Sequence, residues 1–292
     1  MARLVHVSDL HCPPLPAMTV REALSKRVLG YASWHRKRKA LHRNEVLEAL
    51  TRDVAACGPD HVCVTGDLTN LGLAAEAPTV AHWLARFGDA RDVSAVPGNH
   101  DAYVPDAPAP ERQWADWMRG DEGQPGFPYL RRRGGLAIVG VSSAVATPPF
   151  LATGRIGTEQ AGRLEALLRI ANNEGLARVV LVHHPPQPGA VRRRVALSDG
   201  GRLRAVLART GAELVLHGHA HKPVRASLTG PEGAIPVLGV GSASCVGDAR
   251  HPSAGFLVLD LAARDGRLAG TVTDHAYDRV RDAFVEGAQH AL

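Results

Sequence analysis

The chain has few cysteines, few aromatic side chains and no long apolar run. Its 292 residues include only Cys12, Cys57, Cys63 and Cys245, none of them in a C-x-x-C pair. A disulfide framework or a thiolate zinc site is therefore not expected, and the cysteines are interpreted as reduced thiols. No stretch approaches the roughly 18 apolar residues of a membrane span, and the N-terminus carries no signal-peptide pattern. We therefore expect a cytoplasmic protein.

Two catalytic signatures and a strong charge bias are also missing. The sequence contains neither a G-x-S-x-G nucleophile elbow nor a G-x-x-x-x-G-K-[ST] phosphate loop. Lys and Arg number 34 against 29 Asp and Glu, which gives a net charge of +5 and a pI of about 9.3. This mild excess fits an anionic partner. Because no basic groove interleaved with aromatic residues is evident, the sequence does not indicate a nucleic-acid partner.

What remains is the pattern of an α/β protein large enough to bury a sizeable core. Short apolar runs predict strands at 3–9, 61–67, 91–101, 136–143, 178–186 and 212–219. Amphipathic stretches between them predict helices at 44–58, 76–88, 158–175 and 198–211. After residue 222 the pattern is of strands and turns only. We predict a single domain, residues 1–292, in which 223–276 form the strand-rich C-terminal part of a second, largely antiparallel sheet.

Metal-competent side chains follow five of the predicted strands. The clusters are Asp9-Leu10-His11, Gly66-Asp67, Gly98-Asn99-His100-Asp101, His183-His184-Pro185-Pro186 and Gly218-His219-Ala220-His221. Taken singly, each is a weak signal, because an Asp at a strand end commonly caps a helix and a lone histidine is commonly structural. Ligands of α/β folds bind at the carboxyl ends of strands, so the five clusters together predict one site. In an extended chain, Asp9 and His11 would point the same way.

The chemistry of these donors predicts phosphate-ester hydrolysis. Carboxylate, imidazole and amide donors without thiolate suit two divalent ions such as Mn, Fe or Zn. Two dications opposed by two aspartates leave a charge surplus of about +2, which attracts phosphate oxygens. A metal pair about 3.5–4 Å apart supplies a bridging hydroxide at neutral pH and clamps the phosphoryl oxygens during in-line attack. A nearby histidine can protonate the leaving oxygen.

In this order, the five motifs resemble those of the calcineurin-like metallophosphoesterases over residues 9–221. The resemblance implies a four-layer αββα sandwich of two mixed sheets flanked by helices. It implies as metal ligands Asp9, His11 and His221 for one ion, Asn99, His183 and His219 for the other, and Asp67 as the bridge. It further implies that His100 faces the substrate and that Asp101 orients it. The chain most resembles the bacterial cyclic-nucleotide and glycerophosphodiester phosphodiesterase branch.

Two basic stretches are candidates for substrate selection. Residues 13–43 form an insertion that mixes Arg and Lys with apolar residues. We expect a helical cap over the metal site, and the alternative is peripheral contact with the inner face of an anionic membrane. The second stretch, Arg192-Arg193-Arg194, follows the His183 motif, and it is either a phosphate contact or a solvated charge run.

The leading hypothesis is hydrolysis of a phosphodiester, with a cyclic nucleotide or another small phosphodiester as substrate. A second hypothesis is cleavage of a lipid-linked nucleotide pyrophosphate such as UDP-diacylglucosamine, motivated by the basic amphipathic insertion. A third, of another class, is a metal-holding scaffold without turnover, although a scaffold would not need His100. The strand-rich tail also offers a surface for homo-oligomerisation.

Overall fold

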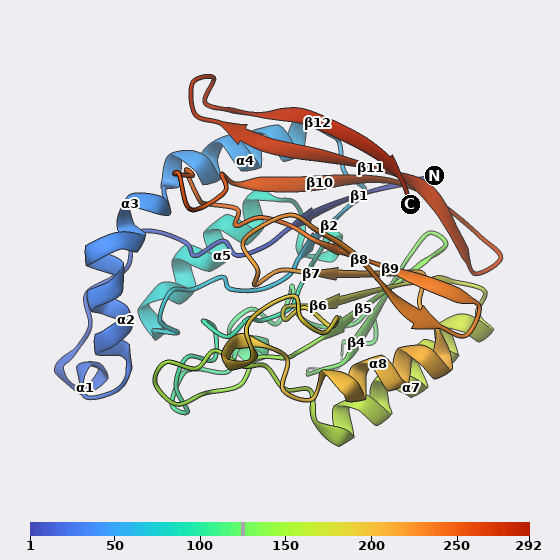
Figure 1. Ribbon diagram of the computed structural model, residues 1–292, viewed down its shortest axis with the longest axis horizontal. Helices are drawn as coiled ribbons and strands as arrows, with labels where there is room; N and C mark the ends of the chain where they lie inside the picture. Colours follow the sequence, from blue (N-terminus) through green and yellow to red (C-terminus); the bar gives the residue numbers. More distant parts are fainter. Residues whose placement is uncertain (124–125) are drawn as a thin grey trace.

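Two six-stranded sheets lie face to face, and helices cover their outer faces (Figure 1). The computed structural model describes residues 1–123 and 126–292. Four layers result, in the order helices, sheet, sheet, helices. The expected α/β sandwich of two mixed sheets flanked by helices is confirmed.

The first sheet has the order β12-β11-β10-β1-β2-β3. Its strands are β1 (Ala2–Val7), β2 (His61–Val64), β3 (Val93–Ala95), β10 (Gly255–Arg264), β11 (Arg267–Asp278) and β12 (Ala283–Ala291). β1, β2 and β3 are parallel, whereas β10 pairs with β1 in the antiparallel sense. Helices α4 (Asn44–Ala56) and α5 (Ala77–Arg86) pack on its outer face.

The second sheet has the order β4-β5-β6-β7-β9-β8. Its strands are β4 (Tyr129–Arg133), β5 (Leu136–Val141), β6 (Ala177–Val182), β7 (Leu214–His217), β8 (Val224–Gly230) and β9 (Gly233–Gly239). β5, β6, β7 and β9 run parallel, and the edge strands β4 and β8 are antiparallel to their neighbours. Helices α7 (Gly157–Asn173) and α8 (Gly200–Thr210) cover this sheet.

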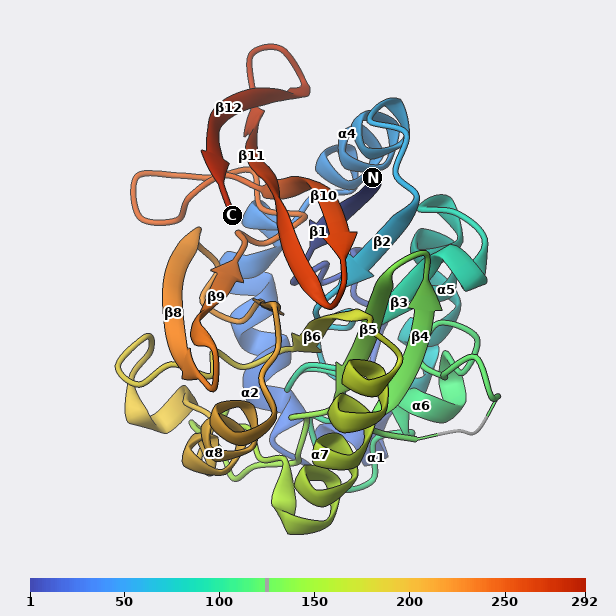
Figure 2. The same cartoon turned by 90° about the vertical axis from the view of Figure 1, so that its right-hand side faces the viewer.

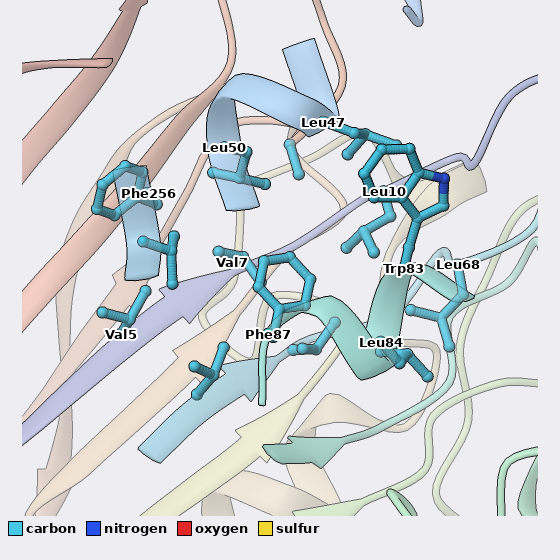
Figure 3. Close-up of a cluster of buried hydrophobic side chains, with 14 of the residues drawn as sticks. Val5, Val7, Leu10, Leu47, Leu50, Leu68, Trp83, Leu84, Phe87 and Phe256 are labelled. Atoms are coloured by element: carbon cyan, nitrogen blue, oxygen red, sulfur yellow. The ribbon is translucent and has the colours of Figure 1, made fainter. Parts of the chain in front are cut away.

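Side chains alternate between the two faces of each strand, and the apolar ones form three buried layers. Val5 and Val7 of β1 pack toward α4 and α5, where Leu47 and Trp83 meet them (Figure 3). Leu4, on the opposite face of the same strand, packs between the two sheets. Burial of each such side chain stabilises the fold by about 1.5–3 kcal/mol. The sandwich is therefore a rigid base for the loops at its strand ends.

The C-terminal region divides between both sheets, which corrects the expectation that 223–276 belongs to the second sheet alone. β8 and β9 extend the second sheet beside α8, whereas β10 to β12 extend the first sheet beside α4 (Figure 2). The apolar pattern identifies strands but does not say which sheet they join. β12 lies beyond the predicted strands altogether.

The insertion 13–43 is mostly helical and is fixed to the body of the domain. It contains α1 (Val20–Ala23), α2 (Arg27–Ser33), a π-helix (Trp34–Arg38) and α3 (Lys39–Leu41). Buried Arg27 donates to the carbonyl oxygens of Leu71 and Gly72 at 3.1 and 2.7 Å. Gly30 lies so close to Leu71 that a Cβ atom there would collide with it. These contacts hold the cap in place.

The remaining helices are short. They are 3₁₀-helices at Ala74–Glu76, Ala90–Asp92 and Arg193–Val195, and α6 at Pro110–Gln113. Over the described parts of the chain, no helix combines the length and the apolar character needed to cross a bilayer.

Candidate metal centre

Left-handed backbone turns bring the expected ligands together. β1, β2 and β7 end at Val7, Val64 and His217, before the side chains that the motifs single out. Positive φ angles are found at Asp9 (55°), His11 (41°), Asp67 (51°), His219 (66°) and His221 (51°). The expectation that Asp9 and His11 lie in extended chain is therefore wrong. Such angles are costly for residues other than glycine and cluster at functional sites, because surrounding structure must enforce them.

Two motif glycines are required by close approach to the site. A Cβ atom at Gly98 would collide with Oδ1 of Asp67, and a Cβ atom at Gly218 would collide with Oγ of Ser8. The absence of a side chain at these positions lets the loops pack directly against the carboxylates. The glycines of the Gly98 and Gly218 motifs therefore have a physical role beside the donors.

One group of donors comes from the loops after β1, β2 and β7. Asp9, His11, Asp67 and His221 each place a ligand atom within 4.8 Å of the others. Nε2 of His11 lies 3.3 Å from Nε2 of His221, and Nε2 of His221 lies 3.1 Å from Oδ1 of Asp9. Asp9 is fully buried, and its Oδ1 accepts no hydrogen bond among the described residues. A buried carboxylate oxygen facing two imidazole nitrogens fits a cation ligand.

A second group shares Asp67 with the first. Asp67, His183 and His219 place their ligand atoms within 4.8 Å of one another. Nε2 of His183 lies 3.4 Å from Oδ2 of Asp67 and 3.3 Å from Oδ1 of Asn99. Nδ1 of His219 lies 3.2 Å from the same His183 nitrogen. The two groups, joined at Asp67, have a donor set that suits two divalent metal ions.

Backbone carbonyls fix which ring nitrogen faces the centre in three of the expected histidine ligands. Nδ1 of His11 donates to Thr69 O at 3.1 Å, and Nδ1 of His183 donates to Thr65 O at 2.7 Å. Nε2 of His219 donates to the carbonyl oxygen of the loop residue Val195 at 2.7 Å. Because the outward nitrogen of each ring carries the proton, the inward nitrogen presents a lone pair to a metal.

Charges within the centre shift the pKa values of its members in opposite directions. Burial alone would raise the pKa of Asp67, but the imidazoles of His183 and His100 hold it well below its usual range. Burial alone would lower the pKa of His183, but the Asp67 carboxylate raises it to about 9. His183 must therefore release a proton to act as a metal ligand.

His100 borders the centre without joining either donor group. Its backbone N–H donates to Oδ1 of Asp67 at 2.8 Å, and its Nδ1 donates to Asn70 O at 2.5 Å. The hydrogen bonds of the Asp101 carboxylate do not go to the His100 ring, which Asp101 was expected to orient. It accepts backbone hydrogen bonds from Leu68, Thr69 and Gly98 at 3.2, 2.8 and 2.8 Å. Asp101 thus shapes the loops, and Asn70 orients the imidazole.

The remaining motif side chains do not enter the donor groups. Buried His184 bonds to Oγ of Ser143 at 2.8 Å, and its ring lies 4.4 Å from that of His219. The side chains of Arg192, Arg193 and Arg194 are exposed and do not line the cavity over the metal centre. This segment contributes through its backbone, since it leads to the carbonyl of Val195.

A cavity of about 500 Å³ lies over the centre, and the sequence motifs identify only part of its lining. Its polar residues are Lys26, Ser33, Arg38, Asn99, His100, Tyr103, Thr147 and His221, and its other residues are Leu29, Gly30, Pro149, Phe150, Leu151 and Ala152. The loop 147–152 carried no recognisable motif in the sequence. His42, at the end of the cap, was also missed: its ring centroid lies 4.8 Å from that of His11, and Nδ1 lies 2.8 Å from Ser244 Oγ.

Comparisons with known proteins agree with this architecture. The sequence profile described as calcineurin-like phosphoesterase matches residues 2–223. A dimetal phosphatase from Danio rerio superposes with a TM-score of 0.57 and 14% identity, covering 98% of each chain. The sulfate thiohydrolase SoxB from Thermus thermophilus superposes with a TM-score of 0.55 and 18% identity, covering 98% of this chain and 58% of that one. At these identities the likeness is one of fold. A search among curated proteins found no match.

Proposed function

The chain belongs to the calcineurin-like phosphoesterase family, and on that basis we propose that it hydrolyses a small or nucleotide-like phosphodiester. The observation that carries the proposal is the shared carboxylate of Asp67. It joins two donor groups, and Asn99 and His221 beside them line the cavity that His100 borders. Asp9, His11 and His221 would hold one divalent ion with Asp67, and Asn99, His183 and His219 the other.

Bound ions would supply Lewis-acid attraction for the phosphoryl oxygens and acidify a water molecule. The chain's own residues then have distinct tasks. His183 and Asn99 are held 3.3 Å apart by loops from different strands, which fixes the donor geometry before any substrate enters. Because Nδ1 of His100 is bound to the Asn70 carbonyl, Nε2 is the atom free to face the leaving oxygen. When the ring also carries a proton on Nε2, a hydrogen bond from that nitrogen would stabilise negative charge as the ester bond breaks.

The cavity supports a substrate of nucleotide size. Its volume of about 500 Å³ lies within the range of about 300–1,000 Å³ typical of small-molecule sites. Among its lining residues, Asn99 and His100 suit a phosphate, and Leu29 and Phe150 suit an apolar or planar group.

Turnover by the reconstituted protein tests this proposal. The protein loaded with Mn is expected to hydrolyse bis-p-nitrophenyl phosphate, and a panel of cyclic nucleotides, glycerophosphodiesters and nucleotide-sugar pyrophosphates would identify the substrate class. p-Nitrophenyl phosphate serves as the monoester comparison. A background rate with every metal and every ester would instead support the non-catalytic scaffold.

A second candidate, cleavage of a lipid-linked nucleotide pyrophosphate, is favoured by exposed apolar side chains beside the cavity. Val20 of α1 and Leu24, which follows that helix, are 83% and 85% exposed, and Phe150 of the loop 147–152 is 82% exposed. Lys26 joins the two sides, since its Nζ donates to Thr147 O at 2.6 Å. Exposed basic residues of the cap complement an anionic lipid surface; they are Arg21, Arg36, Lys37, Lys39 and Arg43.

Point variants test membrane contact better than removal of the insertion, because Arg27 and Trp34 are buried in the domain. Leu24→Ser combined with Phe150→Ser is expected to abolish co-flotation with phosphatidylglycerol vesicles. The matched control is Val280→Ser, which removes a side chain that is 95% exposed on the β11–β12 turn. If the unmodified protein does not float with these vesicles, the second candidate loses its support.

A further inference from the structure

One cation of the cap, Arg38, faces the cavity over the metal centre. It is the last residue of the π-helix Trp34–Arg38 and lines the cavity together with Asn99, His100 and His221. The two basic residues that precede it in this helix are exposed. Single-turn π-helices are frequent at functional sites, because the wider turn changes the direction of a side chain. Here that turn ends on the one basic residue of this helix that lines the cavity; Lys26, the other basic cap residue of the lining, donates to Thr147 O.

A fixed aromatic platform, and no counter-ion, holds the guanidinium of Arg38. Its Cζ lies 6.0 Å from the ring centroid of buried Trp34. That indole is nearly parallel to the ring of His42, with an interplanar angle of 11°, and His42 is in turn bonded to Ser244. The platform therefore rests on residues packed beside the metal centre. Within the described residues, the guanidinium of Arg38 makes no hydrogen bond and no ion pair.

A second arginine of the cap, Arg27, has a structural role and serves as a comparison. It is buried, donates to two backbone carbonyls and lies 3.5 Å from the carboxylate of Asp106. Arg38 has none of these partners. Burial lowers its pKa and the Asp67 carboxylate opposes that effect, but a guanidinium remains protonated throughout the working range of a protein. A partly desolvated cation without a partner is costly, and an anion entering the cavity removes that cost.

We propose that Arg38 forms an anion subsite for the non-bridging oxygens of a phosphoryl group, next to the metal ligands. The proposal rests on the proposed function and adds to it a residue that selects and positions the phosphate. A planar guanidinium presents two parallel N–H donors, which match two oxygens of one phosphate group. The ligand class is therefore a phosphate ester or inorganic phosphate, bound between His100 and the cap.

Titration of inorganic phosphate into the Mn-reconstituted protein tests the subsite directly, by calorimetry. Arg38→Met is expected to weaken phosphate binding about tenfold or more, the loss expected for a charge-assisted hydrogen-bonded pair. KM for a phosphate ester is expected to rise in parallel. Arg38→Lys keeps the charge without the two-pronged geometry and is expected to lose less. The matched control is Arg36→Met, an exposed arginine of the same helical turn, which should bind phosphate as the unmodified protein does.

Metal content and thermal unfolding of each variant separate a local effect from misfolding. If Arg38→Met does not fold, Arg38→Lys decides: weaker phosphate binding supports the subsite, and unchanged binding overturns it. Equal affinity in Arg38→Met and the unmodified protein, or an equal loss in Arg36→Met, also overturns it. If the unmodified protein hydrolyses no ester while Arg38→Met still weakens phosphate binding, the proposed function fails and the subsite stands.

Discussion

Nε2 of His183 lies 3.4 Å from Oδ2 of Asp67, and through this carboxylate the two donor groups become one centre. The same oxygen of Asp67 also lies 3.8 Å from Nε2 of His11. Its removal therefore affects both groups.

Asp67→Ala is expected to lose both ions and all activity together. Asp67 is the only donor that belongs to both groups of the described residues, so neither group keeps its full set without it. Elemental analysis after dialysis and the rate of bis-p-nitrophenyl phosphate hydrolysis measure the two effects. The control is Asp116→Asn, which removes an exposed carboxylate that belongs to neither donor group. Two ions per chain in Asp67→Ala would contradict a shared ligand.

His100→Ala is expected to keep the ions and lose rate. The His100 ring is bound to Asn70 O and belongs to neither donor group, so its loss removes a hydrogen bond to the leaving oxygen. A positioned acid or base contributes about 10²–10⁴-fold to a rate, and a fall of that size in kcat is expected. His82→Ala, on the exposed face of α5, should change neither quantity. Equal metal loss in His100→Ala and Asp67→Ala would place His100 among the ligands instead.

Gly98→Ala is expected to impair metal binding although the substitution is chemically mild. Its Cβ would collide with Oδ1 of Asp67, so either the loop or the carboxylate must move. Gly162→Ala, in the exposed interior of α7, is a matched control because its Cβ meets nothing within 4 Å. That control is expected to stabilise the fold by about 0.5–1 kcal/mol. Full metal content in Gly98→Ala would show that the loop has more freedom than the close approach implies.

Stability is expected to fall as the pH drops from 6.5 to 4, in part because of His61. Burial, and then the neighbouring Arg133 and Arg131, lower the pKa of His61 from 6.5 to about 3. The unfolded chain binds a proton at this residue below pH 6.5, whereas the native chain does not, so acid favours unfolding. The contribution lost between pH 6.5 and 4 is about 3 kcal/mol for this residue.

His61→Gln tests that contribution, since the amide can still reach Oγ of Ser94, the 2.8 Å partner of His61. The free energy of unfolding of this variant, followed by denaturant titration at several pH values, should depend less on pH. His35→Gln, at an exposed position of the cap, should leave the dependence unchanged. An identical dependence in His61→Gln would show that the imidazole is charged in the folded protein.

Much of the fold and of the donor set could be predicted because both follow from short-range patterns. Buried parallel strands are continuous apolar runs, and the site side chains come directly after them, so Asp67 and His183 were recognised by their position. The left-handed turns at Asp9 and His219 could not be read from the pattern, because they depend on the loops packed against them. The division of the C-terminal strands between two sheets likewise depends on long-range pairing.

The surroundings of individual arginine side chains were the least predictable feature. Arg131, one of three consecutive arginines, is buried and donates at 2.7 Å to the carbonyls of Ala90, Val93 and Asp116. Arg38 stands among many cationic residues of the cap, and its position in the sequence does not distinguish it from Arg36 and Lys37 of the same π-helix. Whether a guanidinium meets carbonyls, solvent or a cavity is decided by elements far away in the chain.

The antiparallel pairing of β10 with β1 has a consequence for biosynthesis. All the expected ligands precede residue 222, but Ala243 N–H and Ser242 Oγ bond to the carbonyls of Ser8 and Asp9, and β10 covers the open edge of β1. During synthesis the complete set of donors therefore leaves the ribosome before β10, which pairs with β1, has emerged. Loading with ions would then be tied to release of the finished polypeptide, and a truncation after the final histidine motif would retain the donors but lose their support.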